Sequence, residues 1–475
     1  MRKKWLKRAL WVLLTPIILF VILMVLLYVP PVQNFIRKQA TAMASDATGM
    51  DISVDRIDLR FPLNLLVRGA LVVQPADSVA GVQHPDTLLS MESLNVRVQA
   101  WPLLKGRVEV DDITLKQVAV NSSNLIEGMQ LKGVLGRFFL ESHGIDLSKE
   151  DAILNNIELS DTHVQVLLAD TTETALNWKV TLHALALKNV SVDLQMPLDS
   201  MRLAAHLGDA KITDAAADLK HQFYGWKKFL LSGTSLNYDT GSTLVATDST
   251  DVKPVEGFDP SHIALRDIRI GIDSVMYMGK NMNAVISEFS MNERSGLSVS
   301  SLTGRLFADS TVIRIPSLKL LTPHSEMNLT AQTYWELINI PTAGRLTARF
   351  SARIGKQDVL LFTGGLPETF KEAYPFRPLV IHAGTEGNLK QMQITRFTAD
   401  LPGAFSLSGG GEFWNLTDSL KRSGSMDFEM HTQNLNFLTA LSGTVPDNSL
   451  VIPDSMNLAA RVGLDGPQCT AALKL

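Results

Sequence analysis

The sequence predicts a mostly β protein, in which one N-terminal transmembrane helix is followed by an elongated, curled, antiparallel and repeating β-sheet shaped like a groove, with a few short helices. Three observations lead to this prediction. Residues 9–29 are apolar and carry no charge. Apolar and polar residues then alternate with a period of two over much of residues 51–475, as in antiparallel strands that bury one face. Part of this region also repeats itself.

The stretch from Ala9 to Val29 is long enough to cross a bilayer core as a helix, at about 1.5 Å per residue. Five basic residues precede it and only Arg37 and Lys38 follow closely, so residues 1–8 are expected in the cytoplasm and the body on the far side. A cleaved signal peptide, ending near Ala44, is the alternative, but the apolar run is longer than a usual signal core. The side chains expected to anchor the helix include Leu10, Trp11, Ile18, Phe20, Leu26 and Tyr28.

A short amphipathic helix is predicted over residues 30–50. It begins after Pro30-Pro31, and its apolar residues recur at spacings of three and four: Val32, Phe35, Ile36, Ala40 and Met43. Such a helix either lies at the membrane surface or covers the first edge of the sheet, and the sequence leaves both alternatives open.

The strands of the body, residues 51–475, have one apolar and one polar face. Turns are expected at Asn155-Asn156 and at Asp239-Thr240-Gly241, and helices over 124–140, 358–362 and 434–441. The residues that we expect to line the apolar inner face are Leu94, Val96, Val98, Val192, Leu194, Ile268, Ile270, Ile272, Leu346, Phe350, Ile354, Met426, Phe428 and Met430.

An internal repeat is visible over about residues 297–445. The segment Gln357–Thr363 resembles Gln433–Thr439, and each follows an alternating strand. Upstream, Tyr334-Trp335-Glu336-Leu337 resembles Phe413-Trp414-Asn415-Leu416. A repeat of this length favours stacked units that contact their neighbours.

No motif in the sequence indicates an enzyme, a metal site or a cofactor. The first 40 residues hold seven basic and no acidic side chains, so residues 41–475 carry 37 basic against 48 acidic residues, which disfavours nucleic-acid binding. The single cysteine, Cys469, excludes an internal disulfide. Asp111-Asp112 is expected in a turn or bulge, because the apolar phase slips there. Ser408-Gly409-Gly410-Gly411 is likewise expected to be a turn or bulge, since it lacks the pattern of a nucleophile elbow.

An ordered set of segments resembles the N-terminal part of the AsmA-like/TamB family of diderm bacteria. The set runs from Ala47–Ile52 and Ile57–Leu65 through Pro85–Ser90 to Trp101–Val110. The resemblance implies an inner-membrane protein whose periplasmic body is a curled β-groove with an apolar interior. It implies phospholipids as partners and a passive role in phospholipid transport between the inner and outer membranes. The alternative is a non-enzymatic scaffold, or translocation and assembly module, that helps to insert outer-membrane proteins.

In the TamB type, a further C-terminal domain binds an outer-membrane barrel protein. No such domain is recognisable before Leu475. The resemblance therefore implies either an N-terminal part of such a protein or a shorter relative, and the barrel partner depends on which of the two it is.

Overall fold

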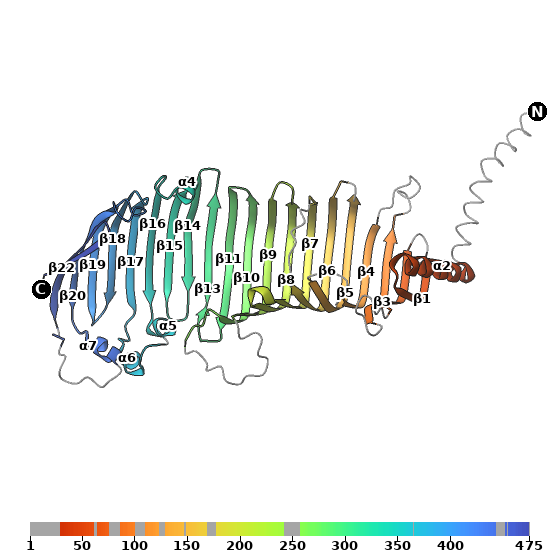
Figure 1. The fold of residues 1–475 in the computed structure, drawn as a ribbon, viewed down its shortest axis with the longest axis horizontal. Coiled ribbons are helices and arrows are strands. Elements are labelled where there is room, and N and C mark those ends of the chain that lie inside the picture. Colours follow the sequence, from red (N-terminus) through yellow and green to blue (C-terminus); the bar gives the residue numbers. More distant parts are fainter. Residues whose placement is uncertain are drawn as a thin grey trace, which may run out of the picture. The chain divides into compact units, whose positions relative to one another are not determined.

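The computed structural model describes residues 29–60, 64–75, 86–99, 110–122, 129–146, 149–168, 177–241, 257–363, 365–442, 452–453 and 455–474. The chain divides into two units, Met1–Gly208 and Asp209–Leu475, with the boundary inside strand β8 (Met201–Asp218). Both units consist mostly of strands lying beside their sequence neighbours (Figure 1). The sequence does not predict the division, because no Pro- or Ser-rich linker marks it.

The predicted anchor over residues 9–29 lies outside the described residues. Among the helices that the structure describes, none is both long and apolar enough to cross a membrane. Helix α2 (Pro30–Thr48) occupies the position where the sequence predicts an amphipathic helix, with proline at its start and Gly49 in the left-handed conformation after its end.

Helix α2 covers the first edge of the sheet. Arg37 Nη1 donates to the carbonyl oxygens of Val54 and Asp55 at 2.8 and 3.0 Å, and Gln33 Nε2 donates to that of Leu59 at 3.1 Å. These acceptors belong to strand β1, so the helix satisfies backbone groups that an edge strand would otherwise expose. Of the two alternatives that the sequence left open, the packing of α2 matches the one in which the helix covers the first edge of the sheet.

Unit 1 is a ladder of consecutive strands. The alternating segments of the sequence form them as predicted, and each strand pairs with the one before it. The strands are β1 (Asp51–Arg60), β2 (Asn64–Gln74), β3 (Asp86–Val98), β4 (Val110–Asn121), β5 (Met129–Asp146), β6 (Asp151–Leu168) and β7 (Lys179–Met196), followed by the 3-10 turn η1 (Pro197–Asp199).

Three sequence predictions are wrong in unit 1. Of the helix expected over 124–140, residues 129–140 are described and belong to strand β5, which pairs with β4 on one side and β6 on the other. Asn155-Asn156 lies inside β6 instead of in a turn. Among the described strands β1 to β7, neighbours pair antiparallel except β6 and β7, which pair in parallel. The bulge expected at Asp111-Asp112 is confirmed, since the register of β3 and β4 shifts there.

The parallel pairing requires β6 to be strongly curved. Lys179 pairs with Asp151, so the chain returns from Leu168 to the opposite end of β6 in 11 residue steps. At full extension these steps cover at most about 40 Å, to which the gap between neighbouring strands adds about 5 Å. A straight strand of 18 residues would separate its ends by roughly 56 Å. The ends of β6 are closer than that, and the strand must bend.

A line of residues that are skipped in the strand ladders crosses β1 to β7, and those among them with positive φ allow the strands to bend. We call it the crease. Neighbouring crease residues face one another but are skipped in the strand ladders, whereas the residues on either side are paired. In every strand but β6, the nearest apolar residues on the two sides, such as Met91 and Leu94, are three residues apart, so the period of two is broken there; in β6, Thr162 takes one of these positions. The crease consists of Asp55, Gly69, Glu92, Gln117, Gly136, Asp161 and Asn189.

The crease places several residues in the left-handed conformation. Gly69, Gln117, Asp161 and Asn189 have φ of 60°, 47°, 52° and 52°. Asn and Asp tolerate this region better than most residues, and Asn189 Nδ2 donates to Asp161 Oδ1 at 2.7 Å. At Gly69 a Cβ atom would also overlap the carboxylate of Asp55, so the position needs glycine for two reasons. In unit 2, Asp214, Gly233 and Asp267 have φ of 48°, 60° and 53° within β8, β9 and β10.

Unit 2 continues with antiparallel strands of 2 to 18 residues and a few short helices. Its elements are β9 (Phe223–Thr240), β10 (His262–Met278), β11 (Asn281–Glu293), β12 (Ser298–Val299), β13 (Ser301–Ala308), β14 (Val312–Leu321), β15 (Glu326–Tyr334), α4 (Trp335–Asn339), β16 (Leu346–Ile354), α5 (Lys356–Leu361), α6 (Glu368–Ala373), β17 (Leu379–Gly387), β18 (Gln391–Leu401), β19 (Phe405–Trp414), β20 (Ser423–Thr432), α7 (Asn436–Thr439), η3 (Ala440–Ser442), β21 (Met456–Asp465) and β22 (Gln468–Lys474).

The segments Gln357–Thr363 and Gln433–Thr439 of the repeat occupy equivalent places after a strand, whereas Trp335 begins helix α4 and its counterpart Trp414 ends strand β19. Helices α5 and α7 each follow a strand, β16 and β20, as the sequence predicts. Of the turn or bulge expected at Ser408–Gly411, no turn forms, because these residues belong to β19, but the register against β18 shifts opposite Gly410. A Cβ atom on Gly409 would come within 2.7 Å of the Asp427 carbonyl oxygen. These glycines therefore permit close approach between strands.

Candidate apolar binding face

An uninterrupted row of apolar residues crosses unit 2 from β9 to β22. Directly paired residues on neighbouring strands present their side chains on the same face. Starting from Phe229, the strand register leads from strand to strand through residues that are all Phe, Ile, Leu, Ala or Gly. We call this series the apolar row: Phe229, Ile272, Ile286, Gly304, Leu318, Leu329, Phe350, Ala383, Phe397, Gly409, Phe428, Ala460 and Leu473.

The residues that the sequence singled out in unit 2 lie on this face. Ile272, Phe350 and Phe428 belong to the apolar row itself. Phe350 and Phe428, from two copies of the repeat, are therefore on one face of the same ladder. The remaining predicted residues occupy alternate positions of the same strands, and so point to the same side: Ile268, Ile270, Leu346, Ile354, Met426 and Met430.

Unit 1 has apolar rows of its own. One, beside the crease, contains Ile57, Val67, Leu94, Leu115, Phe138, Leu159 and Leu187, and the next contains Leu59, Leu65, Val96, Ile113, Leu140, Ile157 and Leu185. The predicted residues Leu94 and Val96 thus fall in apolar rows, and Val98 pairs with Val110. On the other side of the crease, Val192 pairs with Val164 and Leu194 with Val166.

Most side chains on these faces are half-buried rather than enclosed. Phe350, Phe397 and Ile394 line an open hollow of about 320 Å³ whose lining is almost entirely apolar. Among the described residues, the largest side chains with less than 2% exposure are Leu401 and Thr432. A packed sandwich would bury large side chains throughout its core. The apolar face of unit 2 is therefore open to solvent over much of its area.

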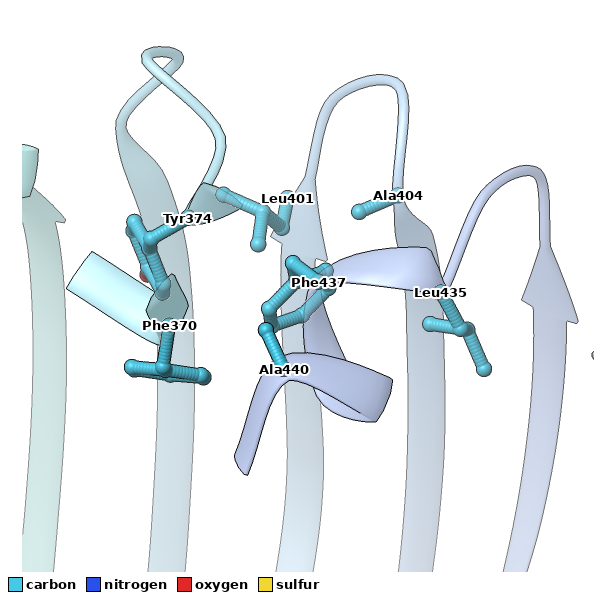
Figure 2. Packing of buried hydrophobic residues seen from close by; sticks show 7 residues of the cluster. All are labelled: Phe370, Tyr374, Leu401, Ala404, Leu435, Phe437 and Ala440. Atoms are coloured by element: carbon cyan, nitrogen blue, oxygen red, sulfur yellow. The ribbon is translucent and has the colours of Figure 1, made fainter. Parts of the chain in front are cut away.

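One end of this face is covered by helices. Phe370 and Tyr374, from α6 and the residue that follows it, pack against Phe437 of α7, with ring centroids 6.0 and 5.6 Å from that of Phe437. Figure 2 shows these rings beside Leu401, at the end of β18, and Ala404. We call these residues, with Leu435 and Ala440, the helix-covered cluster. It is the ordinary hydrophobic core of this part of unit 2.

Helix α6 was not predicted from the sequence, although a signal for it is present. Pro367 stands just before the helix, and Phe370 and Tyr374 are four residues apart, a spacing that puts both rings on one helical face. The sequence also gave no reason to expect that α6 and α7 would cover one end of the sheet.

The opposite face of unit 2 is polar. One row of paired residues consists of Thr303, Lys319, Asn328, Ser351, His382, Thr398, Ser408, Glu429, Ala459 and Lys474. Lys319 Nζ lies 2.8 Å from Glu326 Oε1. Arg461 donates to both carboxylate oxygens of Asp427 at 2.5 and 3.0 Å, and this pairing lowers the pKa of Asp427. Charges thus gather on the face opposite the apolar row.

The open apolar face of unit 2 can bind long apolar molecules. Among the residues that the structure describes, no three His, Cys, Asp or Glu side chains lie close enough together to hold a metal ion. A half-buried apolar face lowers the free energy of any hydrocarbon chain that covers it, because both surfaces leave water. No protein-family model and no characterised protein matches this chain.

Proposed function

We propose that this chain is a non-enzymatic protein, anchored in the inner membrane with its body in the periplasm, whose apolar faces carry phospholipid acyl chains between the inner and outer membranes. The observation that supports this most is the apolar row of unit 2, in which no polar side chain interrupts the thirteen strands that it crosses. The resemblance of residues 47–110 to the AsmA-like/TamB family supports the same function.

The main free-energy barrier to moving a phospholipid through water comes from its acyl chains. Transfer of hydrocarbon from lipid into water costs about 0.8 kcal/mol per CH₂, so a chain of about 16 carbons resists transfer by roughly 10 kcal/mol or more. A continuous apolar face lowers this barrier, because methylene groups leaving one part of the face meet another apolar part. Such a face binds an acyl chain equally well at each point, so it does not set the direction of transport. Direction must come from a gradient or from a partner.

The half-burial of Phe350 and Phe428 favours this function over a scaffold. In a scaffold with closed sandwich domains, the alternating apolar residues would be core residues. Here Phe350 lines an open hollow, whereas Phe370 and Phe437 of the helix-covered cluster are 6% and 7% exposed. The chain thus contains both kinds of environment, and the difference between them can be tested.

The test compares Phe350→Asp and Phe428→Asp with Phe437→Asp and Arg349→Asp in the full chain, purified in a neutral detergent. Binding of a phospholipid with a fluorescent acyl chain is titrated, and thermal unfolding is followed for each variant. We expect Phe350→Asp and Phe428→Asp to stay folded, since water reaches an open face, but to bind several-fold less lipid. Arg349→Asp, on the polar face, should bind lipid like the wild type.

Phe437→Asp provides the reference for a closed core, where an unpaired carboxylate should unfold the surrounding elements. Unfolding of Phe350→Asp and Phe428→Asp to the same extent would contradict the open-face proposal and favour the scaffold. Retention of full lipid binding by folded Phe350→Asp and Phe428→Asp would contradict it as well. Lipid bound around the anchor contributes equally to all variants and cancels in the comparison.

A further inference from the structure

A row of basic residues crosses the polar face of unit 1, next to the crease. The register pairs Arg56 with Arg68, Arg68 with Ser93, Ser93 with Lys116 and Lys116 with Arg137. It continues through Ser160 to Lys188. The row therefore contains five cations and two serines but no acid. This is unexpected on a body whose residues 41–475 carry more acidic than basic side chains.

Two of these contacts place like charges directly opposite each other. Arg56 faces Arg68, and Lys116 faces Arg137, an arrangement that destabilises a sheet. Arg56 is neutralised by Asp58, whose Oδ1 lies 2.6 Å from Arg56 Nε. In the part of the chain that the structure describes, Arg68, Lys116 and Arg137 have no acidic side chain within ion-pair distance. Their charges remain available to an external anion.

These cations surround a hollow of about 760 Å³ on the polar face. Arg60, Arg68, Lys116 and Arg137 line it from four strands, with Glu92 as its single acid, so its net charge is near +3. Asn95 and Thr114 add neutral hydrogen-bonding groups to the lining. The bulk of the lining is polar, in contrast to the hollow beside Phe350.

Charge and donor geometry together select the ligand class. Neighbouring strands are about 4.8 Å apart, so the long side chains of Lys116 and Arg137 can reach one small anion from two directions. Arginine matches the oxygen pairs of phosphate with two parallel hydrogen bonds, and lysine adds a compact point charge. A phosphoryl group, whether of free phosphate or of a phosphodiester, offers more acceptor oxygens to this set than a carboxylate, which has two.

We propose that the hollow lined by Arg60, Arg68, Lys116 and Arg137 binds a phosphoryl group, either of free phosphate or of a phospholipid headgroup. The site lies on the polar face and is separate from the apolar rows. It therefore does not depend on acyl-chain binding. A bound phosphoryl group would also neutralise the like-charge contact between Lys116 and Arg137.

The experiment uses the full chain in neutral detergent micelles and two probes. Radiolabelled inorganic phosphate is measured by equilibrium dialysis, and soluble dihexanoyl phosphatidylglycerol by calorimetry, with dihexanoyl phosphatidylcholine as the zwitterionic comparison. The test variant is Lys116→Gln/Arg137→Gln. The matched control is Lys319→Gln/Arg461→Gln, which removes two cations from the polar face of unit 2 where each has an acidic partner.

We expect Lys116→Gln/Arg137→Gln to lower affinity at least tenfold and Lys319→Gln/Arg461→Gln to change it less than twofold. Saturable binding of inorganic phosphate identifies free phosphate as a sufficient ligand. Binding of phosphatidylglycerol alone identifies the lipid headgroup. Equal affinity in the two double variants, or no saturable binding of either anionic probe by the wild type, overturns the proposal.

A second measurement separates loss of the site from loss of the fold. In phosphate-free buffer, Lys116→Gln/Arg137→Gln should unfold at the same temperature as the wild type or higher, because a like-charge contact is gone. The probe that binds should raise the unfolding temperature of the wild type but not of this variant. A lower unfolding temperature without ligand, or an equal rise with ligand, would show that the two cations do not form an anion site.

Discussion

Single residues at the crease accept a conformation that regular strands exclude. Gln117, Asp161 and Asn189 have positive φ without being glycine, which costs on the order of 1 kcal/mol each. In return the strands of unit 1 can curve, as the short connection between β6 and β7 requires of β6. The polar side chains at these positions are consistent with kinks, since Asp and Asn are the non-glycine residues that enter this region most readily.

The positive φ of Gln117 predicts that glycine is more stable than valine at this position, which is the reverse of the order in a regular strand. Gln117→Gly should stabilise the chain by up to about 1 kcal/mol, because glycine adopts positive φ without strain, whereas Gln117→Val should destabilise it by more than about 1 kcal/mol. Denaturant unfolding of the full chain in detergent measures both changes. At Gln130, an exposed residue of β5 outside the positive-φ set, valine should be tolerated better than glycine. The same order of stability at both positions would contradict the kink.

The pKa of Glu293, at the end of β11, predicts that the unfolding free energy of unit 2 depends on pH. Burial raises its pKa, but hydrogen bonds from Ser295 and from the Ala264 backbone outweigh this, and the pKa lies below its ordinary value of 4.5. A lowered folded-state pKa stabilises the fold above about pH 4.5, and this stabilisation is lost as the pH falls through the folded-state value.

Glu293→Gln should therefore destabilise unit 2 by about 1–3 kcal/mol at neutral pH, because the amide cannot accept all of these hydrogen bonds. The difference in unfolding free energy between wild type and variant should shrink below pH 4.5. Urea unfolding between pH 7 and pH 3 checks this, with Glu429→Gln, at an exposed site, as control. A difference that stays constant over this range would show that Glu293 does not act through its ionised form.

At the scale of elements, the helices and the strands of unit 2 bury apolar residues to different extents. Phe437 of α7 packs on Phe370 and Tyr374 in the helix-covered cluster. Phe428 of β20 lies in the apolar row, facing Gly409 on one side and Ala460 on the other. The same residue type thus occurs in a closed and in an open environment only a few positions apart.

Truncation of these two rings should have unequal effects. Phe437→Ala should cost about 3–5 kcal/mol, as for other enclosed phenylalanines. Phe428→Ala should cost less than about 2 kcal/mol, because the ring is already partly in water and its removal opens no cavity. Thermal unfolding of both variants gives the comparison. Equal losses would indicate that the apolar row is a closed core.

The strand faces were predictable from the sequence, whereas the departures from regular pairing were not. Alternation alone put Phe350 and Phe428 on one face, because the period of a strand is two. Alternation could not reveal that β6 and β7 are parallel, because apolar and polar residues alternate in the same way in parallel and antiparallel pairs that bury one face. The helix prediction over residues 124–140 is wrong for residues 129–140, because their apolar pattern is ambiguous and only pairing with β4 and β6 shows that they form a strand.

The crease was missed for a different reason. Asp161 and Asn189 are far apart in the sequence, and each by itself resembles a solvated strand residue. Their alignment becomes visible only when the register places them side by side. The signal was nevertheless present as a three-residue step between apolar positions in β1 to β5 and in β7, whereas in β6 Thr162 stands at one of the two positions.

At the scale of the whole molecule, the two units share one asymmetry. Each has apolar rows on one face and charged or polar rows on the other, and this holds for each unit by itself. In unit 2 the polar face is neutralised internally by pairs such as Arg461 with Asp427. In unit 1 the basic row beside the crease lacks such partners for Arg68, Lys116 and Arg137 among the described residues. The apolar faces are thus the shared feature, on which the proposed function depends.

The most direct test of that function is photo-crosslinking of phospholipid in cells that make the full chain. Photoreactive residues replace Phe350 and Phe428 in the apolar row, and Arg349 and Glu429 on the polar face. If the apolar face carries acyl chains, phospholipid should be captured at 350 and 428 at least about fivefold more efficiently than at 349 and 429. Equal capture on the two faces, or none at 350 and 428 in a folded protein, would contradict the account.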